Sequence, residues 1–233
     1  MLDKFIARFL KELPDEIMAE RLNHDLEECG AFFDTQRTEE HYELSSDGAH
    51  SNIFYHMKKA LQHHRICQLC AFILSRKLMK LSILKSINAI VGPRRGAGPL
   101  MQTLAFFLPE ENIRTLFMDP GLDPDKNRAF NLEKHADLTP DDHILIVDDA
   151  LTTGNTIRLC IAGCERHLQK NFSGGGANIE GVAVVVNRAP ETWRPKVFMP
   201  TIPIAWAIRN PLESYQPMFC PLCRAGIPLS RIP

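Results

Sequence analysis

Short apolar runs alternate with amphipathic segments over the second half of the chain. Most of these runs are rich in Ile and Val, and each is bounded by turn formers or charges, which is typical of parallel strands that are buried on both faces. The candidate strands are residues 88–91, 114–118, 143–147, 182–187 and 202–207. Helices are predicted between them at 96–107 and 154–170. This alternation predicts an α/β fold with a parallel sheet, right-handed crossovers and ligands at the carboxyl ends of the strands.

The first 85 residues follow a different pattern. Apolar residues at helical spacing over the first thirty positions predict a helix that breaks or restarts at Pro14. The segment HYELSSDGAHSNIFY, residues 41–55, predicts a strand–turn–strand unit with its turn at Asp47-Gly48. A long helix is expected over residues 56–84.

The composition excludes several classes of protein. The 233 residues include 27 basic and 28 acidic side chains, which gives a formal charge of −1, and 45% of the residues are hydrophobic. These values exclude disordered and fibrous chains, and the near-zero charge argues against a nucleic-acid partner. The apolar runs are far shorter than the roughly 20 residues of a membrane span. Because charges interrupt the N-terminal segment, we expect no signal peptide and a cytoplasmic protein without a membrane partner.

Residues 143–157, HILIVDDALTTGNTI, carry the strongest chemical signal. An apolar strand ends in Asp148 and Asp149, whose adjacent negative charges require a partner such as vicinal hydroxyls or Mg²⁺. The residues from Thr152 to Thr156 then offer hydroxyls and backbone N–H groups at the start of a helix, where phosphate binds. Taken singly, these features are also common as a polar turn and a helix cap. The whole pattern predicts a phosphorylated sugar as the ligand.

A second candidate loop is GPRRGAGP, residues 92–99, which follows the strand predicted at 88–91. Its Gly and Pro residues allow a tight loop that exposes backbone amides. Arg94 and Arg95 add two permanent charges whose planar forks suit pyrophosphate oxygens. The alternative is an ordinary solvated surface loop.

The segment LIVDDALTTGNT resembles the signature with which type I phosphoribosyltransferases bind 5-phosphoribosyl 1-diphosphate (PRPP). The shared pattern is an apolar strand, two acids, two spacers and Thr-Thr-Gly before a hydroxyl-bearing segment. The resemblance implies that Asp148 and Asp149 hold the ribose hydroxyls. It implies that the 5′-phosphate lies on a loop made of Thr152, Thr153, Gly154, Asn155 and Thr156. It also implies that pyrophosphate contacts the loop with Gly92, Arg94 and Arg95.

Further segments are similar to the orotate phosphoribosyltransferase branch of this family. Residues 41–55 are similar to its N-terminal hood segment, and CPLCRAGIPL, residues 220–229, is similar to the C-terminal ending of some bacterial members. The resemblance implies a parallel-sheet core with helices on both faces, a small hood, and a homodimer. It divides the chain into N-terminal helices and hood segment (1–85), a phosphoribosyltransferase core (86–210) and a Cys-containing tail that packs on the hood (211–233).

The resemblance implies a Mg²⁺-dependent enzyme that transfers ribose 5-phosphate from PRPP to a nucleobase nitrogen, in a pyrimidine such as orotate, and releases pyrophosphate. Arg94 and Arg95, together with Mg²⁺, would stabilise the leaving group. The family's catalytic loop corresponds to DPGLDPDKNRAF, residues 119–130, where Lys126 and Arg128 are the candidate catalytic cations among three acids. This acidic loop leaves a second hypothesis open, a non-catalytic regulatory protein that binds PRPP or a nucleotide.

Seven cysteines without a secretory signal indicate reduced thiols. Two Cys-x-x-Cys pairs stand out, Cys67 with Cys70 in the predicted long helix and Cys220 with Cys223 in the tail. Four thiolates can hold a structural Zn²⁺, so the two pairs predict a zinc site that pins the tail to the helix. Independent thiols, most of them buried, are the alternative.

Overall fold

The computed structural model describes residues 13–44, 48–81, 87–172, 176–189, 202–211 and 213–230. The part of the first predicted helix that falls in residues 1–12 lies outside these ranges, as does the predicted turn residue Asp47. The expected end of the long helix, at 82–84, also lies outside them.

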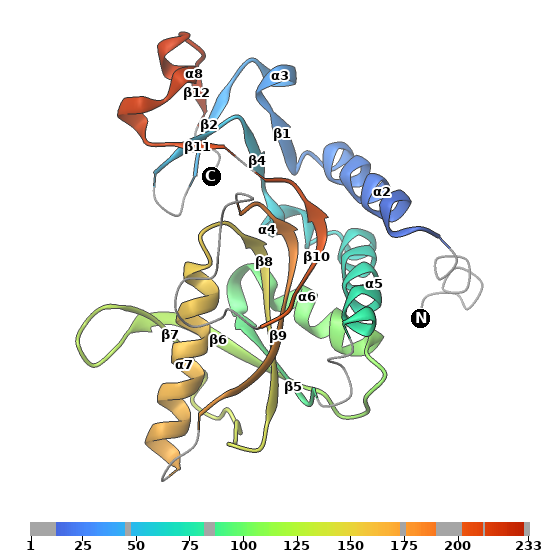
Figure 1. Ribbon diagram of the computed structural model, residues 1–233, viewed down its shortest axis with the longest axis vertical. Coiled ribbons are helices and arrows are strands. Elements are labelled where there is room, and N and C mark those ends of the chain that lie inside the picture. The colour runs from blue at the N-terminus through green and yellow to red at the C-terminus, as the bar shows by residue number, and fades with distance from the viewer. Residues whose placement is uncertain are drawn as a thin grey trace.

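A six-stranded sheet forms the core of the molecule (Figure 1). Its strand order is β10-β9-β8-β5-β6-β7, and every neighbouring pair is parallel except β6 with β7. The strands are β5 (Ala89–Pro93), β6 (Arg114–Leu122), β7 (Arg128–Leu132), β8 (His143–Leu151), β9 (Asn178–Asn187) and β10 (Ile204–Arg209). All five predicted strands are present and the predicted parallel sheet is confirmed. The antiparallel edge strand β7 was not predicted.

Helices cover both faces of this sheet, as predicted. They are α2 (Asp15–Glu28), α5 (His64–Lys80), α6 (Arg94–Phe107) and α7 (Asn155–Asn171). Side chains alternate between the two faces of a strand, so Ile90 of β5 packs in the cluster with α5 and α6, whereas Val91 packs in the cluster with α7. The strands are apolar on both sides for this reason, which explains why their pattern is a continuous run.

A smaller layer lies above the carboxyl ends of the core strands (Figure 1). Its main part, here called the hood sheet, has the strand order β11-β3-β2-β12. The strands of this layer are β1 (Phe32–Asp34), β2 (His41–Glu43), β3 (His50–Ser51), β4 (Ile53–Tyr55), β11 (Ser214–Tyr215) and β12 (Leu229–Ser230). Its short helices are α3 (Thr35–Thr38), α4 (Met57–Ala60), η1 (Pro217–Phe219) and α8 (Pro221–Arg224). Strands from the N-terminal segment and from the C-terminal tail therefore share one sheet.

Two elements differ from the predictions. The helix expected over residues 56–84 is interrupted: α4 ends at Ala60, and α5 begins after His63, whose backbone is extended (φ −81°, ψ 108°). The periodicity did not reveal this change of direction because both helices bury apolar side chains. The segment expected to be a catalytic loop, 119–130, forms a β-hairpin instead, in which β6 continues to Leu122 and β7 begins at Arg128. A helix begins directly after Pro14, at the predicted position, since α2 starts at Asp15.

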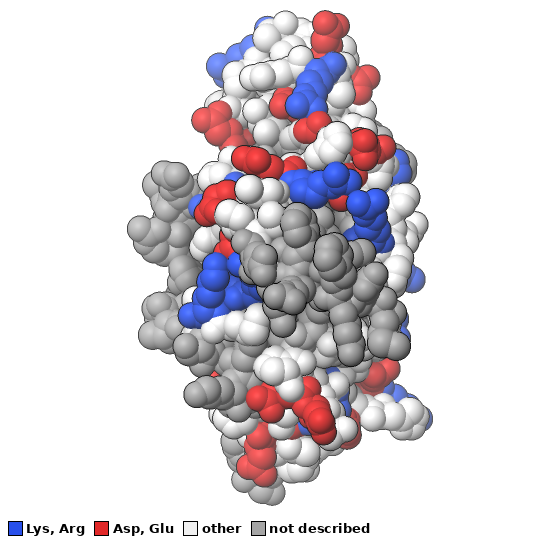
Figure 2. Space-filling view, turned by 90° about the vertical axis from the view of Figure 1, so that its right-hand side faces the viewer, with Lys and Arg blue, Asp and Glu red and all other residues white. Residues whose placement is uncertain are grey.

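The described surface is mixed in charge. Acidic and basic side chains lie side by side on the face that Figure 2 shows. Within the described part of the chain, no helix combines the length and the apolar character that crossing a bilayer requires.

Candidate active site

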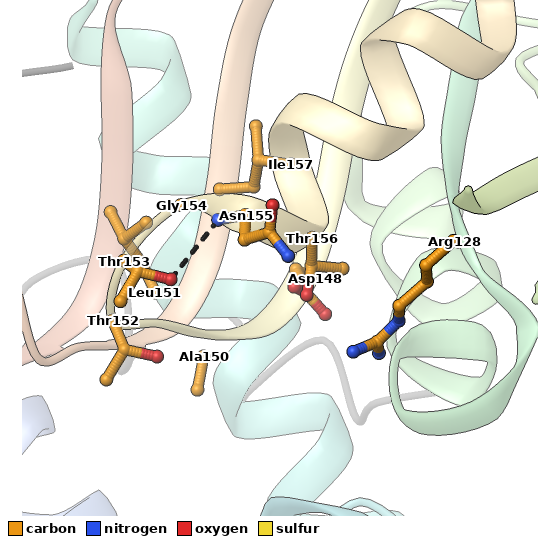
Figure 3. Close-up of a pocket in the computed structure, with 10 residues that line it drawn as sticks. All are labelled: Arg128, Asp148, Ala150, Leu151, Thr152, Thr153, Gly154, Asn155, Thr156 and Ile157. Atoms are coloured by element: carbon orange, nitrogen blue, oxygen red, sulfur yellow. Dashed lines mark hydrogen bonds between the residues drawn. The ribbon is translucent and has the colours of Figure 1, made fainter. Parts of the chain in front are cut away.

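Two adjoining cavities lie where the central strands end. The first has a volume of about 220 Å³, and its lining residues are Arg128, Asp148 and the stretch from Ala150 to Ile157 (Figure 3). The second, of about 320 Å³, lies between the core and the hood layer. Its lining residues are Leu44, Phe54, Tyr55, Met57, Pro93, Arg95, Arg128, Phe130, Asp148, Asp149, Ala150, Thr152, Thr156 and Arg188. Five residues line both cavities, so a ligand can extend from one into the other.

The acid pair lies at the end of β8. Asp148 is buried, with 5% of its surface exposed, and its Oδ1 accepts a hydrogen bond of 2.9 Å from the backbone N–H of Asp149. Burial, and then the negative charge of Asp149, raises the pKa of Asp148 well above its ordinary value. Burial also raises the pKa of Asp149, against the lowering effect of its hydrogen bonds and of the Arg188 charge. Two carboxylates destabilised in this way favour a ligand that supplies hydroxyl donors or a divalent cation.

The loop after the acid pair has the geometry of an anion site. It connects β8 to α7, and Gly154, with φ +75°, precedes the first helical residue Asn155. The N–H groups in the first turn of a helix have no partner within the helix, and they lie at the positive end of its dipole. Figure 3 shows the Thr156 side chain beside Asp148, with the Arg128 guanidinium directed toward them from β7. Phosphate is the anion that such loops commonly bind.

The structure separates the residues predicted for the arginine loop. Arg95 lines the second cavity, but Arg94 is directed toward the β6–β7 hairpin. The Arg94 Nη2 lies 2.8 Å from Glu133 Oε2, its Nε lies 3.2 Å from Asp119 Oδ1, and its guanidinium covers the Phe117 ring at 4.8 Å. Gly92 is buried inside β5, where a Cβ would come 2.1 Å from the backbone oxygen of Val147.

The cause of this separation is a kink at the start of α6. Arg95 (φ −86°, ψ 116°) and Gly96 (φ 107°, ψ −62°) have non-helical backbones, so consecutive side chains diverge. Gly92 itself supports the close packing of β5 against β8, since no side chain fits there.

The two predicted catalytic cations of the segment 119–130 are separated as well. Arg128, the first residue of β7, lines both cavities. Lys126 lies in the turn of the hairpin with φ +64°, and its backbone N–H donates to the carbonyl of Asp123 at 3.0 Å. Lys126 is not among the residues that line these two cavities.

The sequence analysis did not single out Arg188, which also lines the second cavity. Arg188 directly follows β9 and is only 6% exposed. Its positive charge lowers the pKa of Asp149 and of Tyr55, although burial dominates both. A basic residue directly after a predicted parallel strand was the available signal, because strand ends carry ligand sites.

The predicted four-cysteine zinc site is not assembled. Cys70 is fully buried within α5, and Cys67, also on α5, has its Sγ 3.4 Å from Thr103 Oγ1. Burial raises the pKa of both thiols, which favours their protonated form. Among the described residues, Cys220 and Cys223 instead lie beside two histidines of the hood sheet.

Known proteins resemble the chain over most of its length. Orotate phosphoribosyltransferase of Caldicellulosiruptor bescii is 27% identical over 198 residues, which cover 85% of this chain and 91% of that protein. Orotate phosphoribosyltransferase of Chlorobium phaeobacteroides is 28% identical over 195 residues, which cover 82% of this chain and 86% of that protein. No family model matches the chain.

Solved structures show the same fold. The crystal structure of orotate phosphoribosyltransferase from Aeropyrum pernix superposes with a TM-score of 0.53 at 17% identity, covering 81% of this chain and 93% of that one. The predicted resemblance is therefore confirmed: the chain has the fold of the type I phosphoribosyltransferases, and its sequence relatives are orotate phosphoribosyltransferases.

Proposed function

We propose that this protein is a Mg²⁺-dependent phosphoribosyltransferase that transfers ribose 5-phosphate from PRPP to a ring nitrogen of orotate and releases pyrophosphate. The single observation that carries the proposal is the placement of Asp148, Asp149 and the loop from Thr152 to Thr156 in one pair of connected cavities. Relatives named orotate phosphoribosyltransferase, which this chain matches over nearly their whole length, support the same reaction.

The reaction exchanges one bond at C1 of the ribose. The bond from C1 to the diphosphate oxygen breaks, its electron pair leaves with pyrophosphate, and a bond from C1 to the base nitrogen forms as that nitrogen loses its proton. The ribose becomes cationic in the transition state while negative charge grows on the leaving group. Catalysis therefore depends on positioning the two reactants and on stabilising these charges.

We assign the two ends of the sugar to different groups of the protein. In the proposed complex, amides and hydroxyls of Thr152–Thr156 bind the 5′-phosphate, and Asp148 and Asp149 accept hydrogen bonds from the ribose hydroxyls. These hydrogen bonds favour the ionised carboxylates, which burial alone destabilises. Binding energy at the phosphate thus helps to hold C1 at a fixed position.

Cations around the second cavity fit the leaving group. We assign the pyrophosphate contacts to Arg95 and Arg128, which both line this cavity. Arg94 and Lys126 receive no role, because Arg94 is engaged with Asp119 and Glu133, and Lys126 lies in the hairpin turn.

The base is assigned to the hood side of the same cavity, which Leu44, Phe54 and Tyr55 line. Aromatic and aliphatic side chains suit the faces of a planar ring, and Arg188 offers charge complementary to the carboxylate of orotate. In this proposal the base lies above the sugar site.

The donor set also fits Mg²⁺. Asp148 and Asp149 present carboxylate oxygens, the hard ligands that this ion takes together with substrate phosphates. When bound, Mg²⁺ supplies positive charge that neutralises the diphosphate.

We further propose a cytoplasmic homodimer, as the family resemblance implies. Light scattering at several protein concentrations would measure the mass, and a monomeric mass at all of them would contradict the dimer.

Pyrophosphate release tests the reaction directly. The protein is incubated with PRPP, Mg²⁺ and one base from a panel of orotate, uracil, hypoxanthine and nicotinate, with Asp149→Asn as the matched control. Release with orotate alone, absent in the control, is the expected result. Tight PRPP binding without release from any base would instead support the regulatory hypothesis.

A further inference from the structure

A cluster of thiol and imidazole groups lies in the hood layer, apart from the candidate active site. It consists of His41 on β2, His50 on β3, Cys220 directly before α8 and Cys223 within α8. Their ligand atoms all lie within 4.8 Å of one another. His41, His50 and Cys220 are buried (1%, 6% and 1% exposed), and Cys223 is exposed at the surface of the cluster.

Three separations between the ligand atoms come close to those of a tetrahedral metal site. His41 Nε2 lies 3.2 Å from His50 Nδ1, and Cys223 Sγ lies 3.2 Å from His50 Nδ1 and 3.3 Å from His41 Nε2. Zinc bonds of about 2.0–2.1 Å to nitrogen and 2.3 Å to sulfur place tetrahedral ligands about 3.3 Å apart for two nitrogens and about 3.6 Å apart for nitrogen and sulfur. The cluster is already compact enough to close around one ion.

Hydrogen bonds alone cannot satisfy His41 Nε2, His50 Nδ1 and Cys223 Sγ together. A ring nitrogen of imidazole has one in-plane direction, which holds either a proton or a lone pair, and a thiol has one proton. At most two of the three contacts between His41, His50 and Cys223 can therefore be good hydrogen bonds at any time. A cation at the centre satisfies all the ligand atoms at once.

We propose that His41, His50, Cys220 and Cys223 form a structural Zn²⁺ site. Two imidazoles and two thiolates are a ligand set typical of zinc, and four protein ligands leave no open position for a substrate. The inference concerns folding and does not depend on the proposed reaction.

The position of the cluster explains what the metal would stabilise. In the described part of the tail, two strands of two residues each pair with the hood sheet, and each pairs next to a ligand: Leu229 opposite His41 and Tyr215 opposite His50. Strands this short contribute little stability by themselves. A metal ion that joins β2, β3 and α8 would fix the tail, much as a disulfide does in an oxidising compartment.

The same cross-link supports a wall of the active-site cavity. Leu44 directly follows β2, and Phe54 lies on β4, three residues after Ser51 at the end of β3. Both side chains line the second cavity. Metal loss is expected to loosen these segments while the core sheet stays folded.

Metal analysis of the full chain tests the proposal. Protein purified under reducing conditions without chelator should contain about one Zn²⁺ per chain. The Cys223→Ser variant should contain less than a tenth of that amount, and its exposed position makes a folding defect from lost packing small. The matched control is Cys67→Ser, which changes a thiol of the four-cysteine site predicted from the sequence and should keep the metal. Circular dichroism of all three proteins verifies that the fold is retained.

A second measurement needs no variant. Metal-free protein titrated with Co²⁺ should develop the visible absorption of tetrahedral, thiolate-bound cobalt and reach its end point at one equivalent. Zn²⁺ should then displace the cobalt and raise the thermal unfolding temperature. Three results would overturn the proposal: no zinc and no cobalt absorption in the reduced wild-type protein, a Cys220–Cys223 disulfide in place of metal, or zinc lost in Cys67→Ser and kept in Cys223→Ser.

Discussion

The carboxylate of Asp149 lies against Gly96: a Cβ built on Gly96 would stand 3.1 Å from Asp149 Oδ2. Asp149 lies near the end of β8, and Gly96 lies in the kinked start of α6, just after β5; β8 and β5 are hydrogen-bonded neighbours in the sheet. Parallel strands end at the same edge, so loops that are distant in the sequence meet there. This contact joins the acid pair to the arginine loop in one site.

Replacing Gly96 should therefore impair ligand binding. Gly96→Ala adds a methyl group beside Asp149 and forces a side chain into a backbone with φ +107°. We expect PRPP affinity to fall about tenfold, equivalent to about 1.4 kcal/mol, as measured by calorimetry. Gly98→Ala is the control, because its Cβ would meet only Phe117 at an ordinary distance of 3.7 Å. Equal affinities of the two variants would contradict the close approach.

Asp148→Asn should stabilise the ligand-free protein and weaken PRPP binding. The change removes a buried charge and its repulsion with Asp149, while the amide oxygen can still accept the Asp149 N–H. We expect a gain of about 1–2 kcal/mol in the free energy of unfolding, and at least a tenfold loss of PRPP affinity. Chemical denaturation and calorimetry measure the two effects. Asp141→Asn, at an exposed position, should change neither; a less stable Asp148→Asn protein would refute the argument.

The stability gain from Asp148→Asn should depend on pH. The pKa of Asp148 is raised in the folded protein, so the folded state holds its proton where the unfolded chain has lost it. The wild-type carboxyl group therefore destabilises the fold increasingly as the pH rises from about 4, the unfolded value, through the folded pKa. The difference in unfolding temperature between variant and wild type should be near zero below pH 4 and grow above it. A difference that shrinks with rising pH would reverse the assigned sign.

The sequence predicted the core well because local patterns determine it. Apolar runs marked every parallel strand, and the acids near the end of β8 and the threonines after it form a contiguous site that needs no long-range information. The edge strand β7 escaped prediction because Arg128–Leu132 is too short and too polar on its exposed side to show a pattern.

Side-chain directions and distant partners were the parts that the sequence did not reveal. Arg94 and Arg95 are adjacent, yet the kink at Gly96 turns one toward the hairpin and the other toward the cavity. Likewise, the thiols of the tail meet His41 and His50 through strand pairing, which spacing alone does not encode.

The two arginines should differ in their kinetic effects. Arg95→Ala removes a cation that lines the cavity, so we expect the KM for PRPP to rise about tenfold or more. Arg94→Ala breaks only partly exposed ion pairs with Asp119 and Glu133, which contribute about 0–1 kcal/mol. Its KM should stay within about threefold of the wild-type value. Steady-state kinetics with varied PRPP measure both variants, and a larger effect at Arg94 would show that the hairpin contact opens during the reaction.

Arg128 and Lys126 provide the corresponding comparison within the hairpin. Arg128 lines both cavities, and its guanidinium is directed toward Asp148 and Thr156 (Figure 3). It can therefore interact with negative charge on the sugar phosphate and on the leaving group. We expect Arg128→Ala to lower kcat/KM for PRPP by about 100-fold, which corresponds to about 2.7 kcal/mol of transition-state stabilisation. Lys126→Ala should have less than a threefold effect on kcat/KM, because this residue lies in the turn. If Lys126→Ala proved the more damaging change, the hairpin would have to move its turn into the cavity during catalysis, and the assignment of Arg128 would be wrong.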